Sequence, residues 1–364
     1  MPYKTNLVYC SWIVLAYLSS CSFDFDESGV LPSASGEAGE VVLVMDSAKW
    51  AGDLGDEIRR TFRSPVPGLL QDEPLFDLVY VDPYKLTNVL RGAKNLIFVT
   101  SLEGNNRGDQ VLKNYFTQES LQRIENDSSL FMYTKEDEWA KGQSVLHLFQ
   151  KNNEMLLDKI VTNRQKLQNH FIDIDKERLR RAVYKPRRQK NMENILLEEH
   201  QFFIQVPYGY RSAINNDKLV WLRQVGQPVD KNFFITYTDY QSESEFLSEN
   251  LVKFRNRKWR SHLLGDDSLS YMVVQPLAQL DTAVVNFQGK YSVTLRGSWK
   301  LKNNSMGGPF ISHAFVDETQ KRLYYIEGFV YAPGKDKRDL LREMEVILAT
   351  FRSASDLEKE GQSS

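Results

Sequence analysis

The feature that most constrains the fold is a continuous apolar run, Val41-Val42-Leu43-Val44-Met45, which ends at Asp46. An unbroken run of this length is typical of a strand buried on both faces, and such strands occur in parallel sheets covered by helices. Residues 50–62 then carry Leu54, Ile58 and Phe62 at four-residue spacing, which predicts an amphipathic helix. The chain is therefore expected to begin its fold as a strand followed by a covering helix.

The same alternation continues to about residue 190. We expect further strands at 76–81, 95–100, 130–133 and 144–149, and further helices at 83–91 and 152–183. Strands that alternate with helices favour a parallel sheet with right-handed crossovers. Residues 41–190 are thus predicted to form an α/β domain with a mostly parallel sheet and flanking helices.

Residues 191–353 follow a different pattern, in which short β-rich runs are separated by turn residues. We expect strands at 202–206, 219–224, 233–238, 283–287, 291–300, 311–316 and 322–331, and helices at 242–259 and 337–351. This order predicts an α+β domain with an antiparallel sheet and packed helices. The last residues, 354–364, are predicted to be a disordered tail.

The N-terminal segment predicts where the protein is located. Lys4 precedes an apolar run, 7–18, that has the layout of an export signal and is too short to span a bilayer as a mature helix. Leu18-Ser19-Ser20-Cys21 resembles the lipobox of bacterial lipoproteins, whose cysteine is acylated on sulfur and becomes the new N-terminus. The alternative is an ordinary signal peptide with a chance cysteine. Because Cys21 lies where the cleavage site belongs, we expect residues 1–20 to be a lipoprotein signal peptide and Cys21 to carry the lipid.

The residues after Cys21 predict a flexible acidic tether over 21–40. Ser22 occupies a position where Asp often retains lipoproteins at the inner membrane, so we expect the outer membrane of the cell envelope. An acidic cluster of Asp24, Asp26 and Glu27 is similar to signals that some Gram-negative lipoproteins use to reach the cell surface; a solvated spacer is the alternative. The periplasmic and surface faces both stay open.

Cysteine count and charge exclude several classes of function. Cys10 lies in the export signal and Cys21 is the lipid acceptor, which leaves no cysteine for a disulfide, a thiolate metal site or a nucleophile. The net charge of −2 and the export signal argue against nucleic acid as a partner. The five histidines are scattered, with no local zinc spacing, so we expect neither a metal nor a cofactor.

Five stretches resemble a family of bacterial lipoproteins catalogued only as domain of unknown function 4837. They are VPGLLQDEPLFDL (66–78), NLIFV (95–99), WAKGQSV (139–145), RGSWKLKNNSMGGPF (296–310) and YYIEGFVYAPGKDKRDLLREMEVILATF (324–351). The resemblance brings no catalytic residues, because the family has no assigned activity. By its order of elements the C-terminal half is also similar to PsbP-like domains, which are mostly binding or assembly factors.

The candidate binding residues surround a glycine pair. Gly307-Gly308 lies between a predicted strand carrying Arg296 and Trp299 and another carrying His313, and a loop there would suit a ligand. The alternative is a hairpin connection with its aromatic residues in the core. Regular strand alternation places Arg296 and Trp299 on opposite faces, so the binding hypothesis needs a β-bulge near Gly297.

The sequence contains no recognised catalytic motif, and we therefore expect a lipid-anchored envelope protein that acts by binding or assembly. Its partners would be the membrane, through the lipid, and an envelope protein or glycan. A hydrolase that uses His313 with Asp317 or Glu327 is the alternative. Two basic runs, 176–190 and 253–260, are compatible with docking to anionic envelope components or with solvated helix ends.

Overall fold

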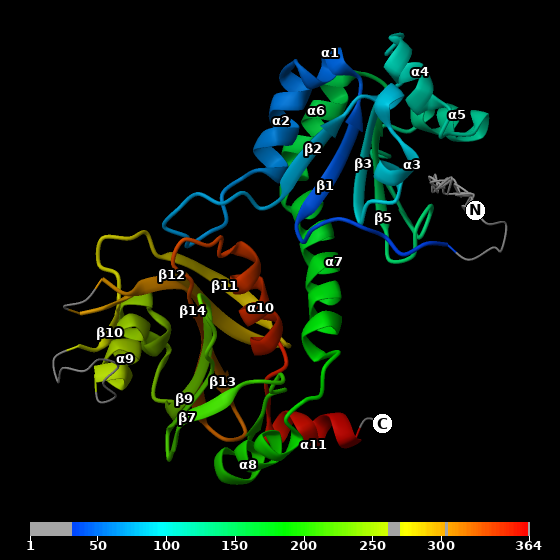
Figure 1. Cartoon of the computed structure of the whole chain (residues 1–364). Helices are drawn as coiled ribbons and strands as arrows, with labels where there is room; N and C mark the ends of the chain where they lie inside the picture. Colours follow the sequence, from blue (N-terminus) through cyan, green and yellow to red (C-terminus); the bar gives the residue numbers. More distant parts are fainter. Residues whose placement is uncertain (1–30, 261–269, 303–304, 363–364) are drawn as a thin grey trace, which may run out of the picture.

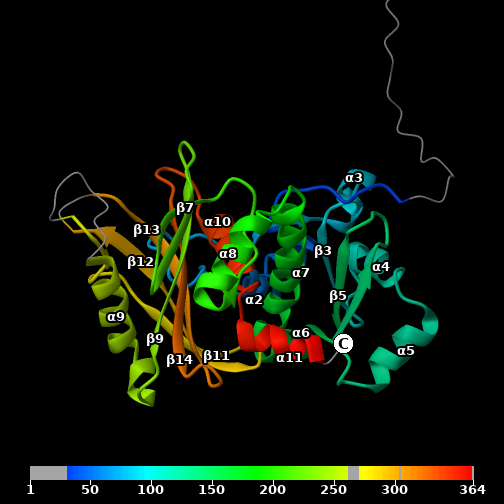
Figure 2. The same ribbon diagram turned by 90° about the horizontal axis from the view of Figure 1, so that it is seen from below.

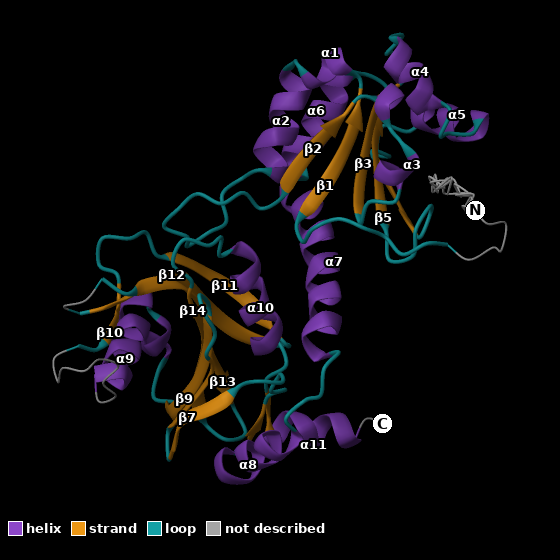
Figure 3. Ribbon diagram, viewed as in Figure 1, coloured by secondary structure: helices purple, strands orange, loops and turns teal. Residues whose placement is uncertain are grey.

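The computed structural model describes residues 31–260, 270–302 and 305–362, so the export signal and Cys21 lie outside the described residues (Figure 1). Each half of the chain forms one large β-sheet with helices on its faces (Figure 3). The predicted fold class is confirmed, since the N-terminal sheet is mostly parallel with flanking helices and the C-terminal sheet is antiparallel with packed helices.

The N-terminal sheet has the strand order β2-β1-β3-β5-β4. Its strands are β1 (Glu40–Met45), β2 (Asp77–Val81), β3 (Asn95–Ser101), β4 (Met132–Glu136) and β5 (Ser144–Gln150). β1 pairs in parallel with both β2 and β3, and β3 pairs in parallel with β5; β4 is the antiparallel edge. The apolar run 41–45 forms β1, an interior strand between β2 and β3, because a strand with neighbours on both sides and helices on both faces needs apolar side chains throughout.

Helices cover the two faces of the N-terminal sheet. They are α1 (Ser47–Trp50), α2 (Asp53–Phe62), η1 (Pro83–Lys85), α3 (Asn88–Arg91), α4 (Arg107–Lys113), α5 (Gln118–Asn126), α6 (Asn153–Thr162) and α7 (Arg164–Tyr184). Leu43 of β1 shares a core with Ile58 of α2 and Phe171 of α7, whereas Val44 shares the opposite core with Leu112 of α4. The single helix predicted over 152–183 is interrupted at Asn163, where the backbone leaves helical geometry (φ −113°, ψ 18°).

The C-terminal sheet is antiparallel and has the strand order β10-β12-β13-β14-β9-β8-β7, with β11 also paired to β12. Its strands are β7 (Arg211–Asn216), β8 (Leu219–Gln224), β9 (Asp230–Asp239), β10 (Met272–Val274), β11 (Asp281–Phe287), β12 (Lys290–Leu301), β13 (Gly307–Asp317) and β14 (Arg322–Tyr331). The strand expected at 202–206 is shortened to β6 (Phe202–Phe203), which pairs with β15 (Arg352–Ser353) in a separate two-stranded sheet.

The helices of the second half are α8 (Lys190–His200), η2 (Glu243–Phe246), α9 (Ser248–Arg260), α10 (Arg338–Leu348) and α11 (Ala354–Gln362). On one face of the sheet, Met344 of α10 packs with Ile311 and Ile326. A Cβ atom added to Gly328 would lie 2.5 Å from Met344 Cβ, so this close approach of helix and strand requires glycine. On the other face Trp259 of α9 is fully buried in a second core.

Charged groups join the two halves. The Glu73 carboxylate accepts hydrogen bonds of 2.7 to 2.9 Å from the backbone N–H groups of Lys337 and Arg338 at the start of α10. Lys176 of α7 lies 2.6 Å from Glu345 of α10, and Figures 1 and 2 show α7 between the two sheets. The boundary drawn near residue 190 stays a prediction.

Two segments expected to lack structure are partly ordered. The prediction of a disordered tail over 354–364 is wrong for residues 354–362, which form α11 and are held by hydrogen bonds from Ser355 to Asp317 and from Lys290 to Asp356. Within the predicted tether, Ala34 N donates to Lys141 O over 2.9 Å. Residues 21–30 of the tether lie outside the described residues.

Candidate functional site

The glycine pair Gly307-Gly308 does not form a binding loop, because both residues belong to β13. A Cβ atom on Gly308 would lie 1.9 Å from the carbonyl oxygen of Val330, and the paired residue Trp299 donates its Nε1–H to that same oxygen over 3.3 Å. The second glycine is therefore explained by close packing of β12, β13 and β14. The ligand-loop hypothesis is wrong at this point.

The candidate residues on β12 point to opposite faces of the sheet. The pairing of β12 with β13 is regular from Ser292 to Lys300, without the bulge near Gly297 that a shared site needs. Trp299 is 4% exposed and belongs to the core under α9, whereas Arg296 lies 2.5 Å from Glu345 of α10 on the other face. Arg296 and Trp299 are not brought together.

His313 is a packing residue, and its side chain forms no hydrogen bond to a carboxylate among the residues that the structure describes. Its Nδ1 lies 3.0 Å from Thr294 Oγ1, and its ring stacks on Phe287 with the centroids 4.4 Å apart. Burial lowers the pKa of His313 to about 4. Asp317 is bonded to two serines, and Glu327 pairs with Arg255. The structure does not assemble the His313–Asp317 or His313–Glu327 pair that the hydrolase alternative requires.

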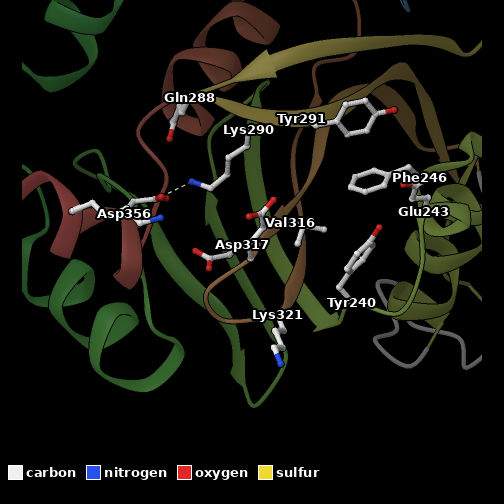
Figure 4. A pocket seen from close by; sticks show the side chains of 13 residues that line it. Tyr240, Glu243, Phe246, Gln288, Lys290, Tyr291, Val316, Asp317, Lys321 and Asp356 are labelled. Carbon is white, nitrogen blue, oxygen red and sulfur yellow. Dashed lines mark hydrogen bonds and ion pairs between the residues drawn. The ribbon is translucent and has the colours of Figure 1, made fainter.

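A hollow of about 970 Å³ lies at one end of the C-terminal sheet (Figure 4). Because neighbouring strands are antiparallel, the ends of β9 and β13 and the starts of β12 and β14 meet at this edge. These strand ends contribute Tyr240, Tyr291, Asp317 and Lys321, and η2 and α11 complete the lining. We call this the sheet-end hollow.

Three aromatic rings form one side of the sheet-end hollow. The Phe246 ring centroid lies 6.1 Å from that of Tyr240 and 5.2 Å from that of Tyr291. Tyr291 is 57% exposed, and the other two rings are partly buried. These three rings pack against one another and remain partly exposed to solvent. They therefore present flat apolar faces to a ligand.

The opposite side of the sheet-end hollow carries hydrogen-bonding groups, as Figure 4 shows for Gln288, Lys290, Asp317 and Asp356. Lys290 Nζ lies 2.5 Å from Asp356 Oδ1. Burial alone would raise the pKa of Asp317 and of Asp356, but hydrogen bonds to each carboxylate outweigh it and hold both pKa values below the ordinary one. Both carboxylates are therefore charged at neutral pH, although Asp317 is 1% exposed and already accepts hydrogen bonds from Ser353, Ser355 and the Gln320 N–H.

None of the aromatic residues of the sheet-end hollow stands out in the sequence as a binding residue. Tyr240 and Tyr291 are 51 residues apart, and the pairing of β9, β14, β13 and β12 brings them to one edge, with Phe246 on η2 beside them. Asp317 was considered only as a partner of His313. One feature of the sequence does point to this site: Tyr240, Tyr291 and Asp317 all lie at the ends of predicted strands. Binding residues occur more often at such ends and in the adjoining loops than in the middle of strands.

The two basic runs are largely paired within the protein. In the first run Arg178 donates to the carbonyl oxygens of Lys94 and Gly142, and Arg180 and Arg181 both pair with Glu177. In the second run Arg255 is fully buried against Glu327. These residues do not form a free cationic surface.

Within residues 31–260, 270–302 and 305–362 no group of three or more His, Cys, Asp or Glu side chains is placed to hold a metal ion. In the same residues no helix has both the length and the apolar character needed to cross a membrane.

Two family models cover most of the chain. Residues 187–350 match the family described as domain of unknown function DUF4837, which confirms the resemblance for the stretches at 296–310 and 324–351. Residues 34–184 match a second domain of unknown function, DUF8532, which includes the other three stretches. Each model matches less than half of the chain, and neither description states an activity.

A search of curated proteins finds no match. Among solved structures, the Saccharomyces cerevisiae Ran-binding protein Mog1p is 9% identical, with 42% of this chain and 90% of that chain covered and a TM-score of 0.29. A STAR-related lipid transfer protein fragment from Xanthomonas axonopodis is 8% identical, with 39% and 96% covered and a TM-score of 0.22. At these scores nothing about the function of this chain follows from either likeness.

Proposed function

We propose that this protein binds a neutral oligosaccharide of the cell envelope in the sheet-end hollow. The observation that carries the proposal is the opposition of three aromatic rings to a row of charged and amide side chains (Figure 4). A pyranose has the matching two-sided character, with C–H groups on its ring faces and hydroxyl groups around its rim. The C–H face packs on aromatic rings, and each hydroxyl can donate and accept hydrogen bonds.

The charge of the lining favours a neutral ligand over a polyanion. Three lysines are balanced by four carboxylates in the sheet-end hollow: Lys290, Lys321, Lys359, Glu243, Asp317, Glu318 and Asp356. A phosphate-rich or strongly acidic polymer would meet as much repulsion as attraction there. Hydroxyl groups bond well to both signs of charge, and hydrogen bonds to charged groups are the stronger ones.

The location of the protein is part of the same proposal. The sequence Leu18-Ser19-Ser20-Cys21 supports attachment of a lipid to Cys21 and anchorage in the outer membrane of the envelope. A surface that binds envelope glycans would act at that membrane without needing catalysis. The protein would then hold or organise a glycan, with binding as its activity.

The test is titration of the full chain, purified in detergent, with chitotetraose, maltotetraose and cellotetraose by calorimetry. We expect one of these to bind and Tyr291→Ala to weaken it roughly 5- to 30-fold, because removal of an exposed stacking ring costs about 1–2 kcal/mol. Tyr208→Ala is the matched control, since Tyr208 is 67% exposed and does not line the hollow. Absence of binding to all three tetramers at millimolar concentration, or equal loss in both variants, would refute the proposal.

A further inference from the structure

A second cavity lies in the N-terminal half, far along the chain from the sheet-end hollow. It has a volume of about 430 Å³ and is bounded by α5 on one side and by β4 and β5 on the other. Its lining is rich in rings, with Tyr115, Phe116, Tyr133 and Phe149 around His147. Cavities of this size with apolar walls and a few polar groups are typical of small-molecule sites.

His147 is the polar group at the base of this cavity. It is 5% exposed, and no hydrogen bond joins it to another of the residues that the structure describes, so its Nδ1 is a buried atom without a partner. The ring stacks on Phe98 with the centroids 5.0 Å apart and contacts Phe116 edge-on at 5.7 Å. A buried polar group usually has a hydrogen-bond partner, because a buried group without a hydrogen bond destabilises the folded protein. An unpartnered imidazole that lines a cavity therefore indicates that a bound molecule supplies its missing hydrogen bond.

A second unpartnered atom belongs to the same lining. Glu138 uses Oε1 to bind Lys135 Nζ over 3.1 Å, while its Oε2 is buried and has no partner among the described residues. Burial lowers the pKa of His147 to about 4, so the imidazole is neutral at physiological pH. A neutral imidazole donates from one nitrogen and accepts at the other, and a carboxylate only accepts. The cavity thus offers apolar walls, one neutral imidazole and one free acceptor.

We propose that this cavity binds a small flat ring compound that carries a hydroxyl group, a phenol in the simplest case. The flat ring would lie among Tyr115, Phe116 and Tyr133, whose ring centroids lie 5.7 to 6.3 Å from that of His147. The hydroxyl group suits His147 in either tautomer, because it can accept from an N–H or donate to a ring nitrogen. Nothing in this inference depends on the oligosaccharide proposal, since the two sites share no residue.

The test compares phenol with toluene, which has nearly the same shape but no hydroxyl group. The full chain in detergent is titrated with each probe while NMR follows the ring signals of His147 and Tyr133. We expect phenol to bind about 3- to 10-fold more tightly than toluene, the effect of one buried hydrogen bond. His147→Phe should reduce the affinity for phenol to that for toluene and leave toluene unchanged, and Tyr133→Ala should weaken both probes.

His170→Phe is the matched control, because His170 lies near Ser144 outside the cavity lining. Since all variants are measured in the same detergent, partition of a given probe into micelles cancels between variants, and phenol and toluene are compared at equal free aqueous concentrations. Equal binding of phenol and toluene, or unchanged phenol binding in His147→Phe, would overturn the proposal. The proposal would also be overturned if phenol at 10 mM, roughly a thousand times the protein concentration, shifted no ring signal of His147 or Tyr133. Even weak aromatic ligands occupy a preformed cavity at that concentration.

Discussion

Replacement of Glu327 by glutamine should destabilise the C-terminal half severely, because it breaks a fully buried ion pair. Arg255 of α9 and Glu327 of β14 are both 0% exposed, and the guanidinium donates to the two carboxylate oxygens over 2.7 and 3.0 Å. Tyr325 Oη adds a third hydrogen bond to the same carboxylate over 2.8 Å. Glu327→Gln keeps the shape of the side chain but leaves the Arg255 charge buried without a counter-ion.

The size of the expected loss in the free energy of unfolding follows from the burial of the ion pair. Removal of one partner of a buried pair costs about 3–5 kcal/mol, whereas an exposed pair contributes about 0–1 kcal/mol. Glu177 provides the exposed comparison, since it pairs with Arg180 and Arg181 on the surface of α7 and is 42% exposed. Glu177→Gln should therefore change the free energy of unfolding by less than about 1 kcal/mol.

Urea unfolding followed by tryptophan fluorescence is the assay, because Trp259 is fully buried one turn after Arg255 on α9 and its fluorescence changes when this core unfolds. We expect Glu327→Gln to lower the free energy of unfolding by about 3–5 kcal/mol and the double variant Arg255→Met/Glu327→Leu to recover most of that. If Glu327→Gln costs no more than Glu177→Gln, the reasoning from burial is wrong.

Three further predictions concern other parts of the chain. Glu73→Gln should lower the free energy of unfolding by about 1–2 kcal/mol in urea titrations, because it removes the charge that caps α10, while the exposed neighbour Asp72→Asn should have little effect. Burial lowers the pKa of His147 and of His313 to about 4, so each stabilises the folded state above pH ~6.5 and loses that contribution as the pH falls towards 4. In this range each histidine should lower the free energy of unfolding by about 1.4 kcal/mol for every unit that the pH falls. Urea midpoints that stay constant between pH 7 and pH 4.5 would contradict this, and His147→Phe should make the slope shallower without abolishing it, since burial lowers the pKa of His170 as well. Cys21→Ala should abolish incorporation of labelled palmitate and leave an unprocessed or soluble product; wild-type protein that takes up no label would refute the anchor.

The positions of many strands could be predicted, because a buried strand has an apolar sequence. The run 41–45 is apolar at every position, and it forms the interior strand β1 with both faces covered. β14 was expected at 322–331 and has those bounds, because its residues are almost all buried. By contrast β7 was missed, since Arg211–Asn216 is a polar edge strand that carries no apolar alternation.

The candidate site was harder to predict than the fold, because its residues meet only through strand pairing. In the sequence, Trp299 and Gly308 together suggest a ligand-binding loop. In the structure, a Cβ atom on Gly308 would lie 1.9 Å from the Val330 carbonyl oxygen, so the glycine is required for packing. The same limit applies to Arg255, which belongs to a basic run in the sequence but is buried in the structure. Charge patterns along a chain do not tell which cations have partners across the fold.

The most direct test of the oligosaccharide proposal is an NMR measurement of contacts between bound sugar and protein. The full chain, with its aromatic residues labelled, is mixed with whichever of the three tetramers binds in calorimetry. We predict nuclear Overhauser effects from the sugar ring C–H protons to the ring protons of Tyr240, Phe246 and Tyr291, as expected for a pyranose face packed on that side of the sheet-end hollow. Contacts that map elsewhere, with none to these three rings, would contradict the proposal.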